Sequence, residues 1–178
     1  MTWSAKITGA DQVAPELQAA VKAGTMAGME VIGIQGQRLV QNFIAAPYDG
    51  QPPAVFSGNL LASIVPHVFE EQSLVRLVIG AGNVNGADLY AAPVETGARP
   101  HMPPSEALVL WVHKKLGIED EKQALSVAFA IAKTIAKRGS RGHEMFSRAL
   151  VELEPLAGPI LEHHIALSMQ AAIAMGGR

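Results

Sequence analysis

Four residues lie close together in the chain and have side chains suited to acid–base, metal or ion-pair chemistry: Glu95, Thr96, Arg99 and His101. They belong to the segment 90–104, YAAPVETGARPHMPP, which contains four prolines and one glycine. Proline lacks an N–H donor and glycine adopts positive φ, so we expect this segment to be neither an ordinary helix nor an ordinary strand. A rigid, charged loop of this kind often contacts a ligand or a partner.

Metal binding and catalysis are the first chemistry to consider. Glu95, His101 and His113 are of metal-ligand type, but no pair of them has HExxH or comparable spacing. His163 and His164 are adjacent, so they point to different faces of a helix. The chain has no cysteine and no GxSxG element, which removes thiolate chemistry and the commonest serine nucleophile. We therefore expect no catalytic residue, no metal and no cofactor, and a protein that is not an enzyme.

A second charged group surrounds the turn RGSRG at residues 138–142. Lys133, Lys137, Arg138 and Arg141 concentrate positive charge there, which suits DNA phosphates or an acidic protein partner. The alternative is a solvated helix end whose cations lie beside the last carbonyl groups. We keep Lys137, Arg138 and Arg141 as candidate contacts for DNA or an acidic partner.

The composition is typical of a folded globular protein. A chain of 178 residues suits one domain with a full core, and 49% apolar with 17% charged residues argues against disorder. The net charge of -2 argues against coating nucleic acid by bulk electrostatics. No secretory pattern opens the sequence, and no apolar run reaches the roughly 18 residues that a membrane span needs. We expect a protein made in the cytoplasm that has no membrane partner.

A long helix is predicted over residues 10–45, with Asp11 as a candidate N-cap. Gly24, Gly28 and Gly36 lie on or near one face of it, and each costs roughly 1 kcal/mol relative to alanine. Two explanations stay open for these glycines. They weaken or break the helix, or they form a face that another backbone approaches closely.

The middle of the chain, residues 57–103, is predicted to be β-rich, with the segment 90–104 as its docking loop. Ser57 is a candidate cap for a short helix that ends at Pro66. Strands are expected at 67–70 and 74–81, followed by a glycine- and asparagine-rich loop. A further extended or one-turn segment is expected at 89–95.

Residues 104–175 are predicted to be helical. One helix begins at residue 104 or 105 and stops at Gly117, and a second covers 119–138 with an acidic start and a basic end that complement its dipole. The last helical region, 143–175, should be broken or kinked near Pro155 and Pro159. The whole pattern predicts a single α+β domain over 1–178: a small antiparallel sheet packed by a long N-terminal helix, then a helical C-terminal region.

Three segments, taken in order, resemble a known family. SGNLLASI, at 57–64, is similar to the Ser/Thr-Gly-x-Leu-x-x-Ser-Ile element of small neck and tail-completion proteins of long-tailed phages. The segment 90–104 is similar to that family's Tyr-Ala-x-x-Val-Glu-x-Gly-Thr/Ala-x-x-x-x-x-Pro element. RGSRGHEMFSRAL, at 138–150, resembles the family's Gly-x-x-Gly-x-x-x-Phe-x-x-Ala-Leu close. The chain departs from the shortest members by its helical stretch 104–138.

The resemblance implies a structural virion protein of the bacteriophage head–tail junction: a neck, tail-completion or minor tail protein. Similar proteins are not enzymes, and they assemble as oligomers, commonly rings that match the sixfold symmetry of the tail. The implied partners are further copies of the chain, the head connector or stopper, and the tail terminator or tail-tube proteins. Packaged DNA near the basic turn is a further possible contact. The implied location is the neck or tail of the virion.

Within the segment 90–104 we take Tyr90, Glu95, Arg99, His101 and Met102 as candidate interface residues. Glu95 and Arg99 can pair across a subunit interface or within one chain. The other three residues can add contact area to an interface, or pack the loop onto its own sheet. The prolines fix the path of the segment, which reduces the entropy lost on binding.

Two competing functions use the same residues differently. The first is a nucleic-acid-binding helical regulator built around the basic turn 137–142. Its second helix would need an exposed recognition face, whereas Met145, Phe146, Ala149 and Leu150 look like a packed face. The second is a small hydrolase, for which the sequence offers no motif.

Overall fold

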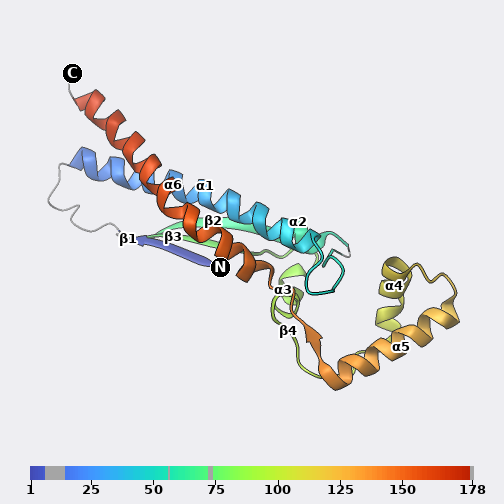
Figure 1. Cartoon of the computed structure of the whole chain (residues 1–178). Helices are drawn as coiled ribbons and strands as arrows, with labels where there is room; N and C mark the ends of the chain where they lie inside the picture. The colour runs from blue at the N-terminus through green and yellow to red at the C-terminus, as the bar shows by residue number, and fades with distance from the viewer. Residues whose placement is uncertain (7–14, 56, 72–73, 177–178) are drawn as a thin grey trace.

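A computed structural model describes residues 1–6, 15–55, 57–71 and 74–176. It has an elongated body, built from a small sheet and two long helices, and a helical arm that extends from one end of the body (Figure 1). The fold is α+β, as the sequence predicts.

The sheet of the body has three antiparallel strands in the order β1-β3-β2. These are β1 (Thr2–Lys6), β2 (Ile64–Glu71) and β3 (Leu74–Ala81). The prediction of β3 is confirmed, and its buried residues Val75, Leu77 and Ile79 show the period of two that one packed face requires. The strand predicted at 67–70 is longer, because Pro66 lies inside β2 instead of ending a helix. Proline is tolerated there because β2 is an edge strand.

The long helices α1 (Pro15–Ala45) and α6 (Met145–Gly176) pack against each other in antiparallel fashion, and α1 also packs on the sheet (Figure 1). The predicted N-cap Asp11 lies outside the described residues. An added Cβ on Gly24 would lie 2.6 Å from the Cα of Ile165, and one on Gly28 would lie 3.3 Å from the Cα of Leu161. The explanation by close backbone approach is therefore correct for Gly24 and Gly28, whereas Gly36 makes room for the side chains of Ile79 and Leu153.

The prediction of a break in the last helix is wrong, because α6 runs without interruption through Pro155 and Pro159. Both prolines lie on its exposed face, so neither ring meets α1. Leu153 and Ala157, on the other face of the helix, are buried against the core. Packing of the buried face stabilises the helix, although the two prolines lack the N–H groups that would donate hydrogen bonds within it.

The prediction of an extended or one-turn segment at 89–95 is also wrong. Those residues belong to α3 (Ala87–Thr96), a helix of 10 residues that contains Pro93. Ala87 and Ala91 bury one face of it, which outweighs the single lost hydrogen bond. The helix ends at Gly97, whose φ of 80° only glycine adopts readily and whose N–H bonds the carbonyl oxygen of Pro93. The range 57–103 thus contains helices as well as strands, since α2 (Asn59–Ser63) precedes β2.

The arm consists of α4 (Ser105–Leu116) and α5 (Glu121–Arg138), and both helices are close to their predicted bounds. Val112, Ala124 and Ala128 form a core of the arm's own, distinct from that of the body. Asp120 caps α5 by accepting a 2.7 Å hydrogen bond from the backbone N of Gln123. A two-stranded ribbon, β4 (Gly97–Ala98) paired with β5 (Ser140–Arg141), joins the arm to the body.

Candidate docking site

Residues 46–51, 93–99 and 139–148 meet where the arm leaves the body, and we call this region the junction. The ribbon pairs Gly97 with Arg141. Just beyond it, the backbone N of His143 donates to the carbonyl oxygen of Val94 at 2.7 Å, and that of Glu144 donates to the carbonyl oxygen of Glu95 at 3.1 Å. The junction therefore links segments that lie far apart in the sequence.

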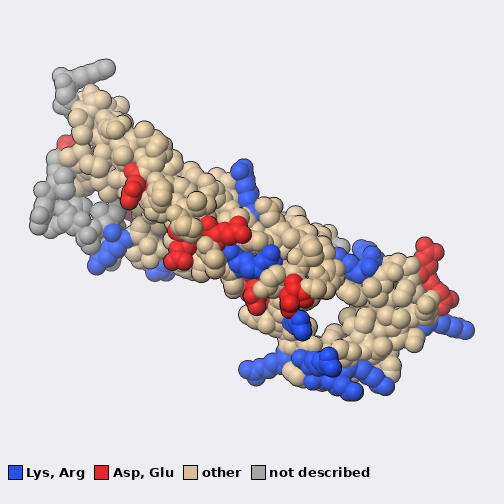
Figure 2. Space-filling model, viewed as in Figure 1, with Lys and Arg blue, Asp and Glu red and all other residues tan. Residues whose placement is uncertain are grey.

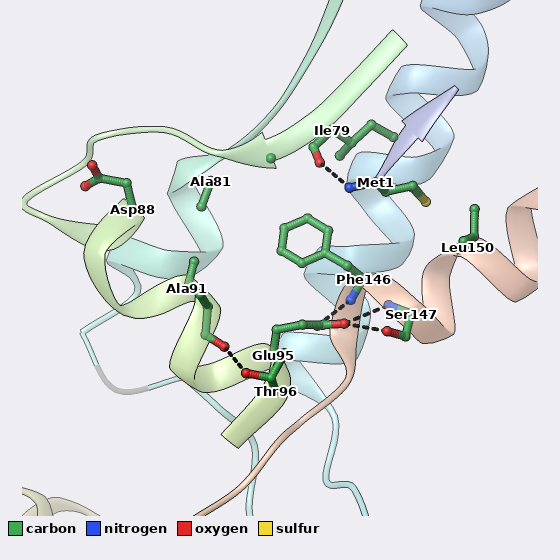
Figure 3. A pocket seen from close by; sticks show the side chains of 12 residues that line it. Met1, Ile79, Ala81, Asp88, Ala91, Glu95, Thr96, Phe146, Ser147 and Leu150 are labelled. Atoms are coloured by element: carbon green, nitrogen blue, oxygen red, sulfur yellow. Dashed lines mark hydrogen bonds between the residues drawn. The ribbon is translucent and has the colours of Figure 1, made fainter. Parts of the chain in front are cut away.

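Glu95 caps α6 from a different helix. Its carboxylate accepts hydrogen bonds from the backbone N of Phe146 at 2.8 Å, the backbone N of Ser147 at 3.0 Å and the hydroxyl of Ser147 at 2.7 Å (Figure 3). The first N–H groups of a helix have no partner within the helix, and the dipole there favours negative charge. The carboxylate of Glu95 is thus engaged inside the chain, and Arg99 lies exposed outside this cluster.

Three glycines allow the strands of the ribbon to approach each other. An added Cβ on Gly97 would collide with the carbonyl oxygen of Ser140, one on Gly139 with that of Ala98, and one on Gly142 with that of Glu95. Gly97 and Gly139 also have φ values of 80° and 73°. The segment RGSRG therefore contains the end of α5 and the short strand β5, with two sterically required glycines beside the strand, and is not a simple basic turn.

Arg148 sits between two aromatic rings in the junction. Its guanidinium carbon lies 4.0 Å from the ring centroid of Phe43 and 4.2 Å from that of Tyr48. The hydroxyl of Tyr48 donates a 2.7 Å hydrogen bond to the carboxylate of Glu144, and this bond raises the pKa of Tyr48. The cluster ties the end of α1 to the start of α6.

The loop after α1 is fastened to the junction by polar contacts. His143 is buried, and its Nε2 lies 2.9 Å from the carbonyl oxygen of Ala46. Since a carbonyl oxygen only accepts, that nitrogen is the donor. Gln51 donates to the carbonyl oxygen of Gly142 at 3.1 Å, and Arg141 pairs with Asp49 at 2.6 Å.

The five candidate interface residues divide into two groups. Tyr90 is half-buried against the core of the body, and Glu95 accepts hydrogen bonds from the start of α6, so the side chains of both are used inside the chain. Arg99, His101 and Met102 are exposed on the irregular segment between β4 and α4, and the Nδ1 of His101 lies 2.8 Å from the carbonyl oxygen of Arg99. These three residues present a surface at the base of the arm.

Of the basic candidates, Lys137 and Arg138 are exposed at the end of α5, whereas Arg141 pairs with Asp49. The backbone of Arg99 lies beside Gly139, so its cation adds to the same region. Lys and Arg side chains gather along the lower edge of the arm in Figure 2. We call Arg99, Lys133, Lys137 and Arg138 the basic patch.

Two clefts flank the junction. One, of about 510 Å³, lies between β3, α3 and α6 and is lined by Ala81, Asp88, Ala91, Phe146 and Leu150, together with the engaged carboxylate of Glu95 (Figure 3). The other, of about 550 Å³, separates the arm from the body and is lined by Pro53, Tyr90, Leu108 and Trp111 among others. The described residues bring together no group of three metal-ligand side chains, and none of their helices is long and apolar enough to span a membrane.

The fold and the junction define an α+β protein whose body carries a helical hairpin on a glycine-rich ribbon. Comparison with known proteins adds no relative, since no family model, no curated protein and no solved structure matches the chain.

Sequence reasoning missed the cap of α6 and the cluster around Arg148. One signal for the cap was present, because GHEMF offers no Ser, Thr, Asp or Asn immediately before the helix. A helix without a local cap needs acceptors from elsewhere. The cluster around Arg148 left no such signal, because its partners are Phe43 and Tyr48, far away in the sequence.

Proposed function

We propose that this protein is a structural component of the phage head–tail junction, a neck or tail-completion protein that docks as an oligomer between the head connector and the tail. The observation that carries the proposal concerns the residues on which the family resemblance rests. Several of them hold the junction together. Glu95 caps α6, and Gly97, Gly139 and Gly142 permit the ribbon. This shared location supports the proposal that the segments 90–104 and 138–150 act as one unit.

The distribution of surfaces supports the same proposal. The junction is held by the hydrogen bonds of Glu95 to α6 and by the guanidinium of Arg148 over the ring of Phe43. The body therefore presents a preformed surface next to the arm. Arg99, His101 and Met102 lie on its rim, and the arm extends beyond it with its own core. Preorganised surfaces of this kind lose little entropy on association. The proposed partners are further copies of the chain, in a ring that is sixfold as in similar proteins, the head connector or stopper, and the tail terminator or tube.

The decisive experiment is electron microscopy of particles made without this protein. We expect full heads without tails, together with free tails, because neither structure would be completed at the joint. Adding the purified protein back should restore joining. Particles with normal tails and normal infectivity in its absence would contradict the proposal.

A second candidate function is nucleic-acid binding by the basic patch, favoured by the exposure of its four cations. Met145 and Ala149 are buried, so the start of α6 does not offer a recognition face. Contacts would therefore be to phosphates, without sequence preference. The test is DNA binding against salt concentration: Lys137→Glu with Arg138→Glu should abolish it, whereas unchanged binding would exclude the patch.

A further inference from the structure

The outer face of α5 carries an unpartnered row of side chains at intervals of four residues. Leu125 and Phe129 are 41% and 45% exposed, although the neighbouring face of the helix buries Ala124 and Ala128 against α4. The row continues with Lys133, whose Nζ lies 4.6 Å from the ring centroid of Phe129, and with the exposed Lys137. We call Leu125, Phe129, Lys133 and Lys137 the arm row. The half of α5 that follows Phe129 contains no acidic residue.

The outer face of α6 carries a second row with the opposite charge. Leu150, Glu154, Gly158 and Glu162 are spaced by four residues and all are exposed, and we call them the α6 row. Val151, beside the row, is 72% exposed. Over the middle of the body Figure 2 shows acidic side chains with basic ones beside them. Within the described residues, neither Glu154 nor Glu162 forms an ion pair, and neither Lys133 nor Lys137 does.

Gly158 lies on the exposed side of α6, immediately before Pro159. Its missing Cβ relieves the clash that a proline ring makes with the preceding residue of a helix. Outside its chain neighbours an added Cβ there would meet nothing within 4 Å, in contrast to the packed glycines of α1. The absent side chain leaves a notch, with a glutamate one turn away on each side.

The arm row and the α6 row can pair whether the two helices run parallel or antiparallel. If Phe129 lies over the notch at Gly158, Lys133 is one turn away, about 6 Å along the axis. It then meets Glu154 when the helices are antiparallel and Glu162 when they are parallel. Apolar contact at the centre with charge pairs beside it is the usual arrangement of a protein interface.

We infer that the arm row of one copy docks on the α6 row of a second copy. The occupant is another copy, because complementary charges and shapes lie at separate places on the same chain and the arm points away from α6 (Figure 1). Such a contact is heterologous: repeated from copy to copy, it closes into a ring or continues as a filament. The inference rests on the proposed function, to which it adds the surface that would hold the ring together.

Charge reversal tests the inference with two variants. Lys133→Glu with Lys137→Glu makes both rows acidic, and Glu154→Lys with Glu162→Lys makes both rows basic. Each variant alone should self-associate at least about tenfold more weakly than the natural chain, because like charges then face each other. An equimolar mixture should recover association, since every arm row then finds an α6 row of opposite charge. Analytical ultracentrifugation measures all three, with Glu30→Lys on α1 as the control reversal.

Cross-linking gives an independent test, because the chain has no cysteine. One protein carries Lys133→Cys on the arm row, and two others carry Glu154→Cys and Glu162→Cys on the α6 row. Under mild oxidation Lys133→Cys should form a disulfide-linked heterodimer with Glu154→Cys if the helices are antiparallel, or with Glu162→Cys if they are parallel, in preference to a mixture with Leu89→Cys on α3. Far-ultraviolet circular dichroism of each variant confirms that it is folded.

Several outcomes would overturn the inference: a natural chain that stays monomeric at millimolar concentration, a mixture that does not recover association, or no preferred heterodimer. Imaging of particles tests the proposed function separately. If the protein joins heads to tails and self-associates without regard to these charges, only the interface assignment fails. If particles form normally without the protein, the neck assignment fails whatever the charge variants show.

Discussion

Single residues of the junction take part in contacts that the local sequence does not specify. The carboxylate of Glu95 holds the first turn of α6, which lies 51 residues away from it in the chain. A sequence reading identifies Glu95 as polar, charged and set among prolines, and from this the residue looks like part of an external site. Its partners are backbone N–H groups, which carry no residue-type signal, so only the fold reveals them.

Removing this cap should lower stability. We expect Glu95→Ala to reduce the free energy of unfolding by about 1 to 2 kcal/mol, because two backbone donors and a hydroxyl lose their acceptor. Glu95→Gln should cost less, since one amide oxygen still accepts. Urea denaturation measures both, and Arg99→Ala is the matched control, with an expected change within about 0.5 kcal/mol. Equal losses at positions 95 and 99 would contradict the cap.

The glycines of the ribbon give a second test at this scale. Gly139→Ala should destabilise the protein by more than about 2 kcal/mol, because the new methyl group meets the carbonyl oxygen of Ala98 in addition to the strain of positive φ. Gly50→Ala is the control, since Gly50 also has positive φ, at 75°, but open space around it. Because both positions have positive φ, the difference in unfolding free energy between the two variants measures the contribution of the clash with Ala98. Similar losses for both would show that the strands separate easily.

Whole elements were predictable where their signals are local. The helices α4 and α5 and the strand β3 follow from apolar periodicity, from the stop at Gly117 and from the acidic start and basic end of α5. The strand β1 and the ribbon were not predicted, because a strand of two to five residues is defined by its partner far along the chain. The helix α3 was missed because Pro93 argues against a helix locally, whereas the burial of Ala87 and Ala91 decides it.

The packing of α1 against α6 leads to different expectations for two glycines. Gly24→Ala should destabilise the protein by about 2 to 4 kcal/mol, since the added methyl group would press on the backbone of Ile165 and separate the helices. Gly158→Ala should change the stability by less than about 1 kcal/mol, because the side of α6 that it occupies is open, so that the gain in helix propensity is opposed only by the clash of the new Cβ with Pro159. Thermal unfolding of both variants checks the contrast. A stable Gly24→Ala protein would mean that the helix pair adapts its spacing.

At the scale of the whole molecule, the arm and the body have separate cores connected through the junction. One hydrogen bond that crosses between them runs from Lys115 to the carbonyl oxygen of Pro53, beside the cleft lined by Tyr90 and Trp111. Neither core relies on the other for its apolar burial, so each should unfold as its own cooperative unit.

Deleting the arm should therefore leave the body folded. We expect a chain in which residues 103–137 are replaced by a short Gly-Ser linker to keep the circular dichroism of the body helices and an unfolding free energy within about 2 kcal/mol of the full chain. The same deletion should abolish self-association, because the arm row is lost. A body that fails to fold would show that the arm belongs to one cooperative core.

The ribbon has a consequence for how such a chain changes during evolution. The backbone of Arg99 lies against Gly139, so the arm enters and leaves the body at nearly the same point. A hairpin attached in this way can be gained, lost or exchanged in a single genetic event without disturbing the sheet or the long helices. Differences in length among proteins that share this body should then concentrate between residues 99 and 139, and the body should change only by substitution.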